Sequence, residues 1–115
     1  MLRAVVVDDE ANLRLLARVI LEGDGVAQVV GEASNGVDAV RLIEDLAPDV
    51  AIIDINLPDM SGLEVIGQLR GHALSIRLVA YSSDDHALAD AIRAGADTAV
   101  LKTGRSEELL AALVA

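Results

Sequence analysis

Carboxylate side chains follow two short apolar runs of the sequence, where they could bind a metal ion. Asp8 and Asp9 come directly after the run 4–7, and Asp54 ends the run beginning at residue 50. Like charges brought together repel one another unless a cation is present. Oxygen ligands with no histidine or cysteine close in sequence favour Mg²⁺, or Mn²⁺, over zinc. Each aspartate alone could simply cap a helix or end a strand, but three together favour a metal site.

Two further polar side chains end later apolar runs. Ser82 follows the run 76–81, and Lys102 follows the run 99–101. A hydroxyl and an ammonium group could bind the oxygens of a phosphoryl group, and an aspartate can itself form an acyl phosphate. A metal ion and Lys102 would offset the charge on the transferred oxygens. The set indicates phosphoryl transfer, although Lys102 could equally be a structural salt-bridge partner.

Five apolar runs of similar spacing are expected to be the strands that position these groups. They are rich in Val and Ile and do not alternate with polar residues, which is typical of a parallel sheet buried on both faces. Right-handed crossovers through helices then predict a doubly wound α/β domain of three layers. The expected strands are residues 4–7, 27–30, 50–53, 76–81 and 99–101.

The segments between these runs have the apolar periodicity of amphipathic helices. Two stripes show it most clearly: Leu13, Leu16, Ala17 and Ile20, and then Ala39, Leu42, Ile43 and Leu46. Capping signals agree with this reading. They are Asn35 as an N-cap, a capping box from Ser61 to Glu64, Gly95 at the end of the fourth helix, and Ser106 followed by Glu107 and Glu108 at the start of the fifth.

Composition excludes several classes of protein. The 115 residues carry 9 basic and 19 acidic side chains, a net charge of −10, which argues against direct nucleic-acid contact. There is no cysteine, so a disulfide framework is excluded and a cytoplasmic location is permitted. No apolar run approaches the roughly 20 residues that span a bilayer, and the start lacks a signal-peptide core. The chain is expected to be one domain without membrane contact.

The sequence resembles the receiver domain of two-component response regulators over its full length. The resemblance lies in VVVDDE at 5–10, IIDINLPDMSG at 52–62, RAGAD at 93–97, and Lys102. Because Thr103 stands where proline is more usual, the chain is most similar to receivers that precede a LuxR/NarL-type helix-turn-helix output domain.

The resemblance implies the fold: a flavodoxin-like (CheY-like) sheet of five parallel strands in the order 2-1-3-4-5, with five helices in three layers. It also implies that residues 1–115 are a receiver domain, the N-terminal part of a longer, cytoplasmic transcription regulator.

The resemblance assigns roles to the polar residues. Asp54 would accept a phosphoryl group from a phosphohistidine on a sensor histidine kinase. Asp9 and Asp54 would bind Mg²⁺ directly, Asp8 would act through the water shell of the metal, and Asn56 would supply its backbone carbonyl. Lys102 would contact the phosphoryl group. Phosphorylation would then bias two existing conformations and so control dimerisation or the output domain.

Two positions of the conformational switch depart from the family pattern. Ser82 is the switch hydroxyl when residues are counted forward from Asp54, but the count back from Lys102 reaches Ala80. Ser82 is preferred, because polar residues follow it as at the start of a loop. Ala99 stands where receivers carry Tyr or Phe, so the usual aromatic switch cannot operate. Tyr81, the sole aromatic, is interpreted as a packing residue that could contribute to switching.

Two other functions stay open. The Ala99 departure permits a phosphorylation-independent protein-interaction module, and Asp54 followed by Ile55 and Asn56 also resembles small Mg²⁺-dependent aspartyl-phosphate phosphatases. The chain is short for such a phosphatase, which needs a covering cap, so no enzymatic activity beyond self-phosphorylation and self-dephosphorylation is expected. A homodimer is possible. His72 and His86 are interpreted as surface residues rather than metal ligands.

Overall fold

Five parallel strands form a single sheet in the order β2-β1-β3-β4-β5. The structure, a computed structural model, describes residues 1–72, 75–103 and 105–114. The order confirms the predicted 2-1-3-4-5 sheet, and the strand ends differ from the prediction by at most three residues. The strands are β1 (Leu2–Val7), β2 (Ala27–Ala33), β3 (Val50–Asp54), β4 (Arg77–Ser82) and β5 (Thr98–Leu101).

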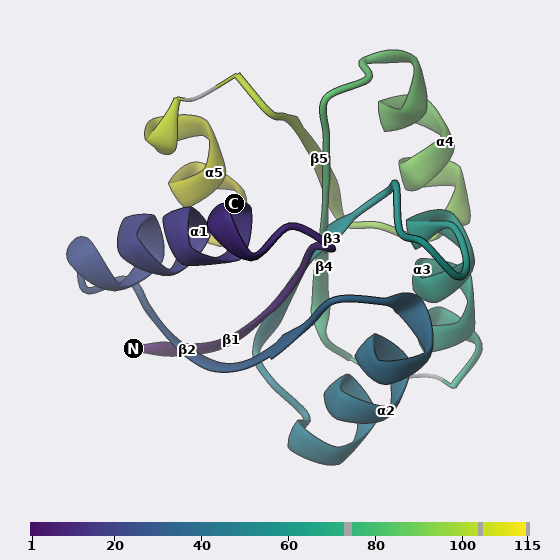
Figure 1. The fold of residues 1–115 in the computed structure, drawn as a ribbon, viewed down its shortest axis with the longest axis horizontal. Coiled ribbons are helices and arrows are strands. Elements are labelled where there is room, and N and C mark those ends of the chain that lie inside the picture. Colours follow the sequence, from purple (N-terminus) through teal and green to yellow (C-terminus); the bar gives the residue numbers. More distant parts are fainter. Residues whose placement is uncertain (73–74, 104, 115) are drawn as a thin grey trace.

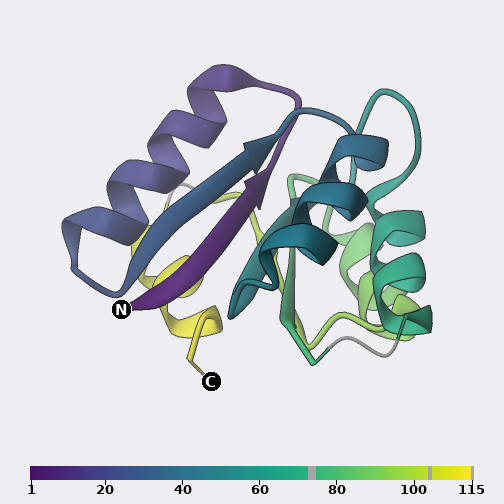
Figure 2. The same cartoon turned by 90° about the horizontal axis from the view of Figure 1, so that it is seen from below.

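Helices follow the strands and cover both faces of the sheet, giving the three predicted layers (Figures 1 and 2). One face packs against α1 and α5, and the other packs against α2, α3 and α4. The helices are α1 (Ala11–Gly23), α2 (Gly36–Leu46), α3 (Gly62–Gly71), α4 (His86–Ala94) and α5 (Ser106–Ala112). The fold is the flavodoxin-like arrangement, whose parallel strands all point their carboxyl ends to one edge.

The core is aliphatic and lies on both faces of the central strands. All five residues of β3 are buried, as are the last four of β1, because helices cover these strands from both sides. On α2, Ala39 and Ile43 are buried and Leu42 and Leu46 are half-buried, which confirms the predicted stripe.

The stripe predicted for α1 is wrong at Leu16, which is 50% exposed. Ala17 and Leu21 are the buried residues of this helix, with Leu13 and Ile20 half-buried beside them. Successive residues of an α-helix are rotated by about 100°, so Leu16 lies at the margin of the face centred on Ala17. Leu16 is therefore half exposed, beside the exposed Leu15 and Val19.

Helix caps were predicted well, with one correction. Asn35 accepts a hydrogen bond from the N–H of Asp38 (2.9 Å), as expected for an N-cap. At α3, Ser61 accepts from Leu63 (3.0 Å), whereas a capping box would have used the N–H of Glu64. That N–H donates instead to the Ser61 carbonyl (3.0 Å). The predicted end of α4 at Gly95, with φ of 123°, and the acidic first turn of α5 are confirmed.

The RAGAD segment ties β5 to the start of β4. Asp97 accepts from the N–H of Leu78 (2.8 Å) and pairs with Arg70 of α3. Arg70 also donates to the carbonyls of Gly95 (2.7 Å) and Ile76 (2.8 Å). One guanidinium thus joins α3, the end of α4 and the entry to β4, which fixes the edge of the sheet opposite the carboxyl ends of the strands.

Candidate phosphoacceptor site

Three aspartates converge at the carboxyl edge of the sheet and are called here the acidic cluster. Asp8 directly follows β1 and Asp54 ends β3, and these neighbouring strands pair Val7 with Ile53. Carboxylate oxygens of Asp8, Asp9 and Asp54 lie within 4.8 Å of one another. Asp8 and Asp54 are buried while Asp9 is exposed, so the cluster has a deep part and an open side.

Lys102 reaches the acidic cluster from the end of β5. Its Nζ lies 2.9 Å from Oδ2 of Asp8 and 3.3 Å from Oδ2 of Asp54, and its side chain is largely buried. Burial alone would lower the pKa of Lys102, but the hydrogen bond to Asp8 and the negative charges of Asp54 and Asp8 outweigh it and raise the pKa. The ammonium is therefore held in its charged form beside two of the three carboxylates.

The Asp54 carboxylate is poorly solvated. Burial raises the pKa of Asp54 above its ordinary value, and the charge of Asp8 adds to this effect. The N–H of Asn56, which donates to Oδ1 of Asp54 (3.2 Å), and the Lys102 ammonium lower the pKa in part. A weakly hydrated carboxylate oxygen with a cation beside it can act as a nucleophile once it is ionised.

The structure places Ser82, and not Ala80, at the edge that carries the acidic cluster. Ser82 is the last residue of β4 and is fully buried, and its carbonyl accepts from the N–H of Lys102 (2.7 Å). Its hydroxyl accepts from the N–H of Asp84 (3.1 Å). Ala80 lies further back in the sheet, paired with Ile53 and Ala99.

The loop after β3 carries Asn56 and is held by contacts that the sequence did not predict. Asp59 accepts from the N–H groups of Gly36 (2.7 Å) and Val37 (2.9 Å) at the start of α2. These bonds lower the pKa of Asp59. An acidic residue in a loop near the uncapped amides of a neighbouring helix is a weak signal, because the sequence does not show which helix lies nearby.

Gly62 brings the end of this loop against β3. Its N–H donates to the carbonyl of Ile55 (2.7 Å), and a Cβ at this position would lie 2.2 Å from the backbone oxygen of Asp54. Gly62 is thus a position where two backbone segments approach closely next to Asp54, and only glycine leaves room for this contact.

The residues present fit a divalent cation that prefers oxygen ligands. Three carboxylates within 4.8 Å carry more negative charge than Lys102 offsets. Beside them, a hollow of about 410 Å³ is lined by Asp9 and by residues 55–61, which include Asn56. Carboxylate, carbonyl and water oxygens are the ligands that Mg²⁺ and Mn²⁺ favour.

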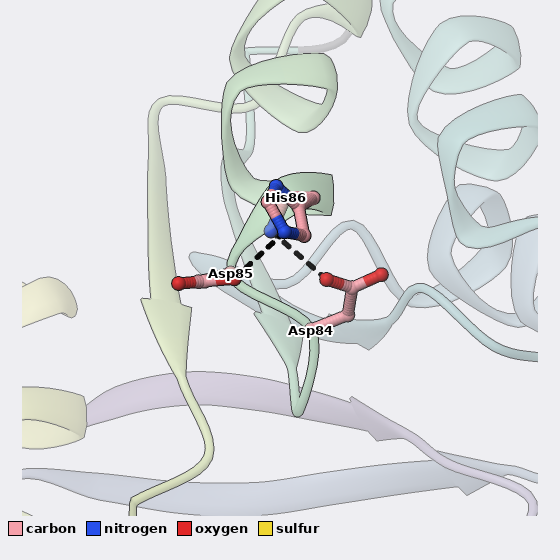
Figure 3. Close-up of side chains that lie close together, drawn as sticks. All are labelled: Asp84, Asp85 and His86. Atoms are coloured by element: carbon pink, nitrogen blue, oxygen red, sulfur yellow. Dashed lines mark hydrogen bonds and ion pairs between the residues drawn. The ribbon is translucent and has the colours of Figure 1, made fainter.

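A second group of titratable side chains lies at the start of α4 (Figure 3). Asp84, Asp85 and His86 bring potential ligand atoms within 4.8 Å of one another, whereas His86 was predicted to be a surface residue rather than a metal ligand. The His86 side chain is 94% exposed and lies 3.8 Å from Asp85. His72 is a surface residue paired with Glu44 (2.7 Å). Both histidines are on the surface, as predicted.

The fold and the acidic cluster define a doubly wound α/β domain with a polar site at the carboxyl ends of its strands. Residues 4–114 match the family described as the response regulator receiver domain. The chain belongs to this family, in which a phosphoacceptor role is general.

Three similar proteins illustrate the relationship. The nitrate/nitrite response regulator NarL of Escherichia coli K12 is 39% identical over 111 residues, which cover 95% of this chain and 51% of that protein. The chemotaxis protein CheY of Listeria monocytogenes is 32% identical, covering 98% of this chain and 96% of that protein. The receiver domain of a putative response regulator NarL from Mycobacterium tuberculosis superposes with a TM-score of 0.91 at 32% identity, covering 97% and 92% of the two chains.

The chain spans about half the length of NarL and of several other curated regulators that it matches. Within the residues that the structure describes, no helix combines the length and apolar character required to cross a bilayer.

Proposed function

We propose that Asp54 accepts a phosphoryl group from a phosphohistidine of a sensor histidine kinase in a Mg²⁺-dependent reaction. The observation that carries this proposal is the convergence of Asp8, Asp9 and Asp54 with the Lys102 ammonium at the carboxyl edge of the sheet. A structural cap needs one carboxylate, whereas this arrangement gathers three and supplies one cation.

The metal ligands in this proposal are the carboxylates of Asp9 and Asp54 and the backbone carbonyl of Asn56, with Asp8 acting through the water shell. When bound, Mg²⁺ would supply positive charge against the oxygens of the transferred group. Asp9 is the exposed member of the acidic cluster, which suits a ligand at the entrance of the site. Mn²⁺ would serve the same oxygen ligands.

The transfer step uses the ionised Asp54 carboxylate. One of its oxygens forms the new bond to phosphorus while the nitrogen–phosphorus bond of the phosphohistidine breaks, and the imidazole nitrogen keeps the electron pair. Lys102, already 3.3 Å from an oxygen of Asp54, would contact the phosphoryl oxygens. The Ser82 hydroxyl, at the end of the neighbouring strand, would move to donate a hydrogen bond to the same group.

Phosphorylation adds roughly −1.5 to −2 charges, which can bias a pair of existing conformations. In a longer regulator this change would control dimerisation or a helix-turn-helix output domain that binds DNA, while this domain itself makes no nucleic-acid contact. The setting would be the cytoplasm, where a sensor kinase presents its phosphohistidine. The domain would catalyse nothing beyond its own phosphorylation and dephosphorylation.

The test uses acetyl phosphate as a small phosphoryl donor in the presence of Mg²⁺, with intact mass as the measurement. The wild-type chain should gain the mass of one phosphoryl group, and Asp54→Asn should gain none. Asp45→Asn, which makes the same charge change at an exposed position of α2, should behave like wild type. An adduct that persists in Asp54→Asn, or no adduct on the wild-type chain, would contradict the proposal.

Ala99 favours one other function, a phosphorylation-independent protein-interaction module. Its methyl group, half-buried on β5, replaces the aromatic that completes the usual switch. If this were the function, acetyl phosphate would modify Asp54 without changing the exchange of amide hydrogens anywhere else in the chain.

A further inference from the structure

Tyr81 lies between the phosphoacceptor site and one covering layer of helices. It is the penultimate residue of β4, and its Cα pairs with those of Asp54 and Val100 in the flanking strands. Because side chains alternate along a strand, Tyr81 and Ser82 point to opposite faces of the sheet. Tyr81 packs with the core beneath α1 and α5, on what is called here the α1–α5 face.

The Tyr81 ring contacts the same ammonium group that binds the acidic cluster. Lys102 Nζ lies 5.4 Å from the centre of the ring, while it also lies 2.9 Å from Asp8 and 3.3 Å from Asp54. A cation within about 6 Å of a ring centroid is attracted to the face of the ring. The position of Lys102 therefore links the charge state of the site to the environment of Tyr81.

We infer that Tyr81, rather than position 99, is the aromatic side chain that responds to phosphorylation, and that the response emerges on the α1–α5 face. The inference rests on the proposed function, since it starts from a phosphoryl group on Asp54. That group draws the ammonium toward its own oxygens. A movement of Lys102 toward those oxygens and away from the ring lengthens the 5.4 Å contact and weakens the attraction.

The ring has space to respond when this contact weakens. Tyr81 and Lys102 line a cavity of about 160 Å³ together with aliphatic side chains of α1 and α5: Leu13, Leu16, Ala17, Ile20 and Leu109. Leu16 connects this cavity with the surface, where it is 50% exposed beside Leu15 and Val19. A change in the ring position thus alters the packing of α1 against α5 and the surface that Leu16 presents.

The opposite face lacks a comparable side chain. Ala99 packs with the core beneath α2, α3 and α4, and it lines an open groove of about 470 Å³ with Leu88, Leu101 and other residues of β5 and α5. A methyl group cannot move between a buried and an exposed position as an aromatic ring does. Because the chain has one tyrosine and no phenylalanine or tryptophan, no other side chain of this kind can take the role.

Two measurements on the same samples test the inference. Tyrosine fluorescence of the wild-type chain reports Tyr81 alone, and hydrogen exchange read by mass spectrometry compares peptides of α1 and α5 with peptides of α4 and β5. Both are recorded before and after treatment with acetyl phosphate and Mg²⁺, with intact mass as the record of phosphorylation. The variants are Tyr81→Phe, which keeps the ring, and Tyr81→Leu, which removes it, with Leu88→Ala as a control in the groove beside Ala99.

Phosphorylation should change the tyrosine fluorescence and should change exchange most in α1 and α5. Tyr81→Phe and Leu88→Ala should keep this exchange difference, and Tyr81→Leu should lose it while still forming the adduct. An adduct accompanied by unchanged fluorescence, or by exchange differences confined to α4 and β5, would overturn the inference and leave the proposed function intact. No adduct on the wild-type chain would overturn both.

Discussion

Binding of Mg²⁺ to the acidic cluster should raise the melting temperature of the chain. The three carboxylates repel one another, and Lys102 offsets only part of their charge. The fully formed cluster exists only in the folded state, because the chain has to bring β1 and β3 together to create it. A ligand that binds only the folded state adds its binding free energy to the free energy of unfolding.

The size of this effect follows from mass action and chain length. At 100 times its dissociation constant, the ion adds about 2.7 kcal/mol to the free energy of unfolding. Unfolding entropy of about 2.1 cal/mol/K per residue gives about 0.24 kcal/mol/K for the 115-residue chain. The melting temperature should therefore rise by about 11 °C at that Mg²⁺ concentration.

Scanning calorimetry at constant ionic strength measures this shift, with NaCl in place of MgCl₂ as the reference. Asp9→Ala should lose most of the shift, since Asp9 is the exposed member of the acidic cluster and its removal leaves the core intact. Asp45→Ala changes the net charge equally, from −10 to −9, at an exposed site on α2 and should keep the shift. A melting temperature insensitive to millimolar Mg²⁺, or equal shifts in both variants, would refute the metal assignment.

Three further predictions follow from buried contacts; thermal or urea unfolding measures each change in stability, and intact mass after treatment with acetyl phosphate and Mg²⁺ measures the rate of phosphorylation. Because the pKa of Asp54 is raised, its ionised carboxylate lowers the free energy of unfolding at any pH above that pKa. Asp54→Asn should therefore be more stable than wild type at neutral pH without divalent ions. This difference in stability should vanish as the pH falls through the raised pKa. Gly62→Ala should destabilise the chain by about 1–3 kcal/mol and slow phosphorylation, because the added Cβ would meet the backbone of Asp54. The control Gly67→Ala, in the same helix, places its Cβ in open space and should stabilise the chain by about 0.5–1 kcal/mol. Asp97→Ala should destabilise by about 1–3 kcal/mol, because it leaves Arg70 and a β4 amide without this acceptor.

The parallel sheet was accessible from the sequence for a physical reason, whereas the strand order that brings the acidic cluster together was implied by the resemblance to receiver domains. Apolar runs buried on both faces identify parallel strands, and residues that follow such strands must meet at one edge. Asp8, Asp54 and Lys102 each stand at the end of a run, so their convergence follows from the strand order. The residue types then supply the chemistry.

Features that depend on contacts between separate elements were not accessible in this way. Periodicity alone placed Leu16 in the core, because the sequence does not show how wide a face of α1 the sheet covers. Asp59 and Arg70 bind backbone groups of other elements, and those partners become known only when the fold brings them together. Counting residues along the chain likewise could not decide between Ser82 and Ala80 as the residue at the carboxyl edge. The register of the sheet places Ser82 there.

Lys102 links the acidic cluster to the Tyr81 ring, because its one ammonium group contacts both. Before phosphorylation it pairs with Asp8 and Asp54 and lies over the Tyr81 ring. A divalent ion among the same carboxylates offsets more charge than an ammonium can, which reduces the attraction that holds Lys102 to Asp8. A phosphoryl group on Asp54 then offers stronger, charge-assisted acceptors. In the proposed mechanism, metal binding would therefore favour the movement of Lys102 that phosphorylation would complete, and the ring of Tyr81 would lose its contact with the ammonium.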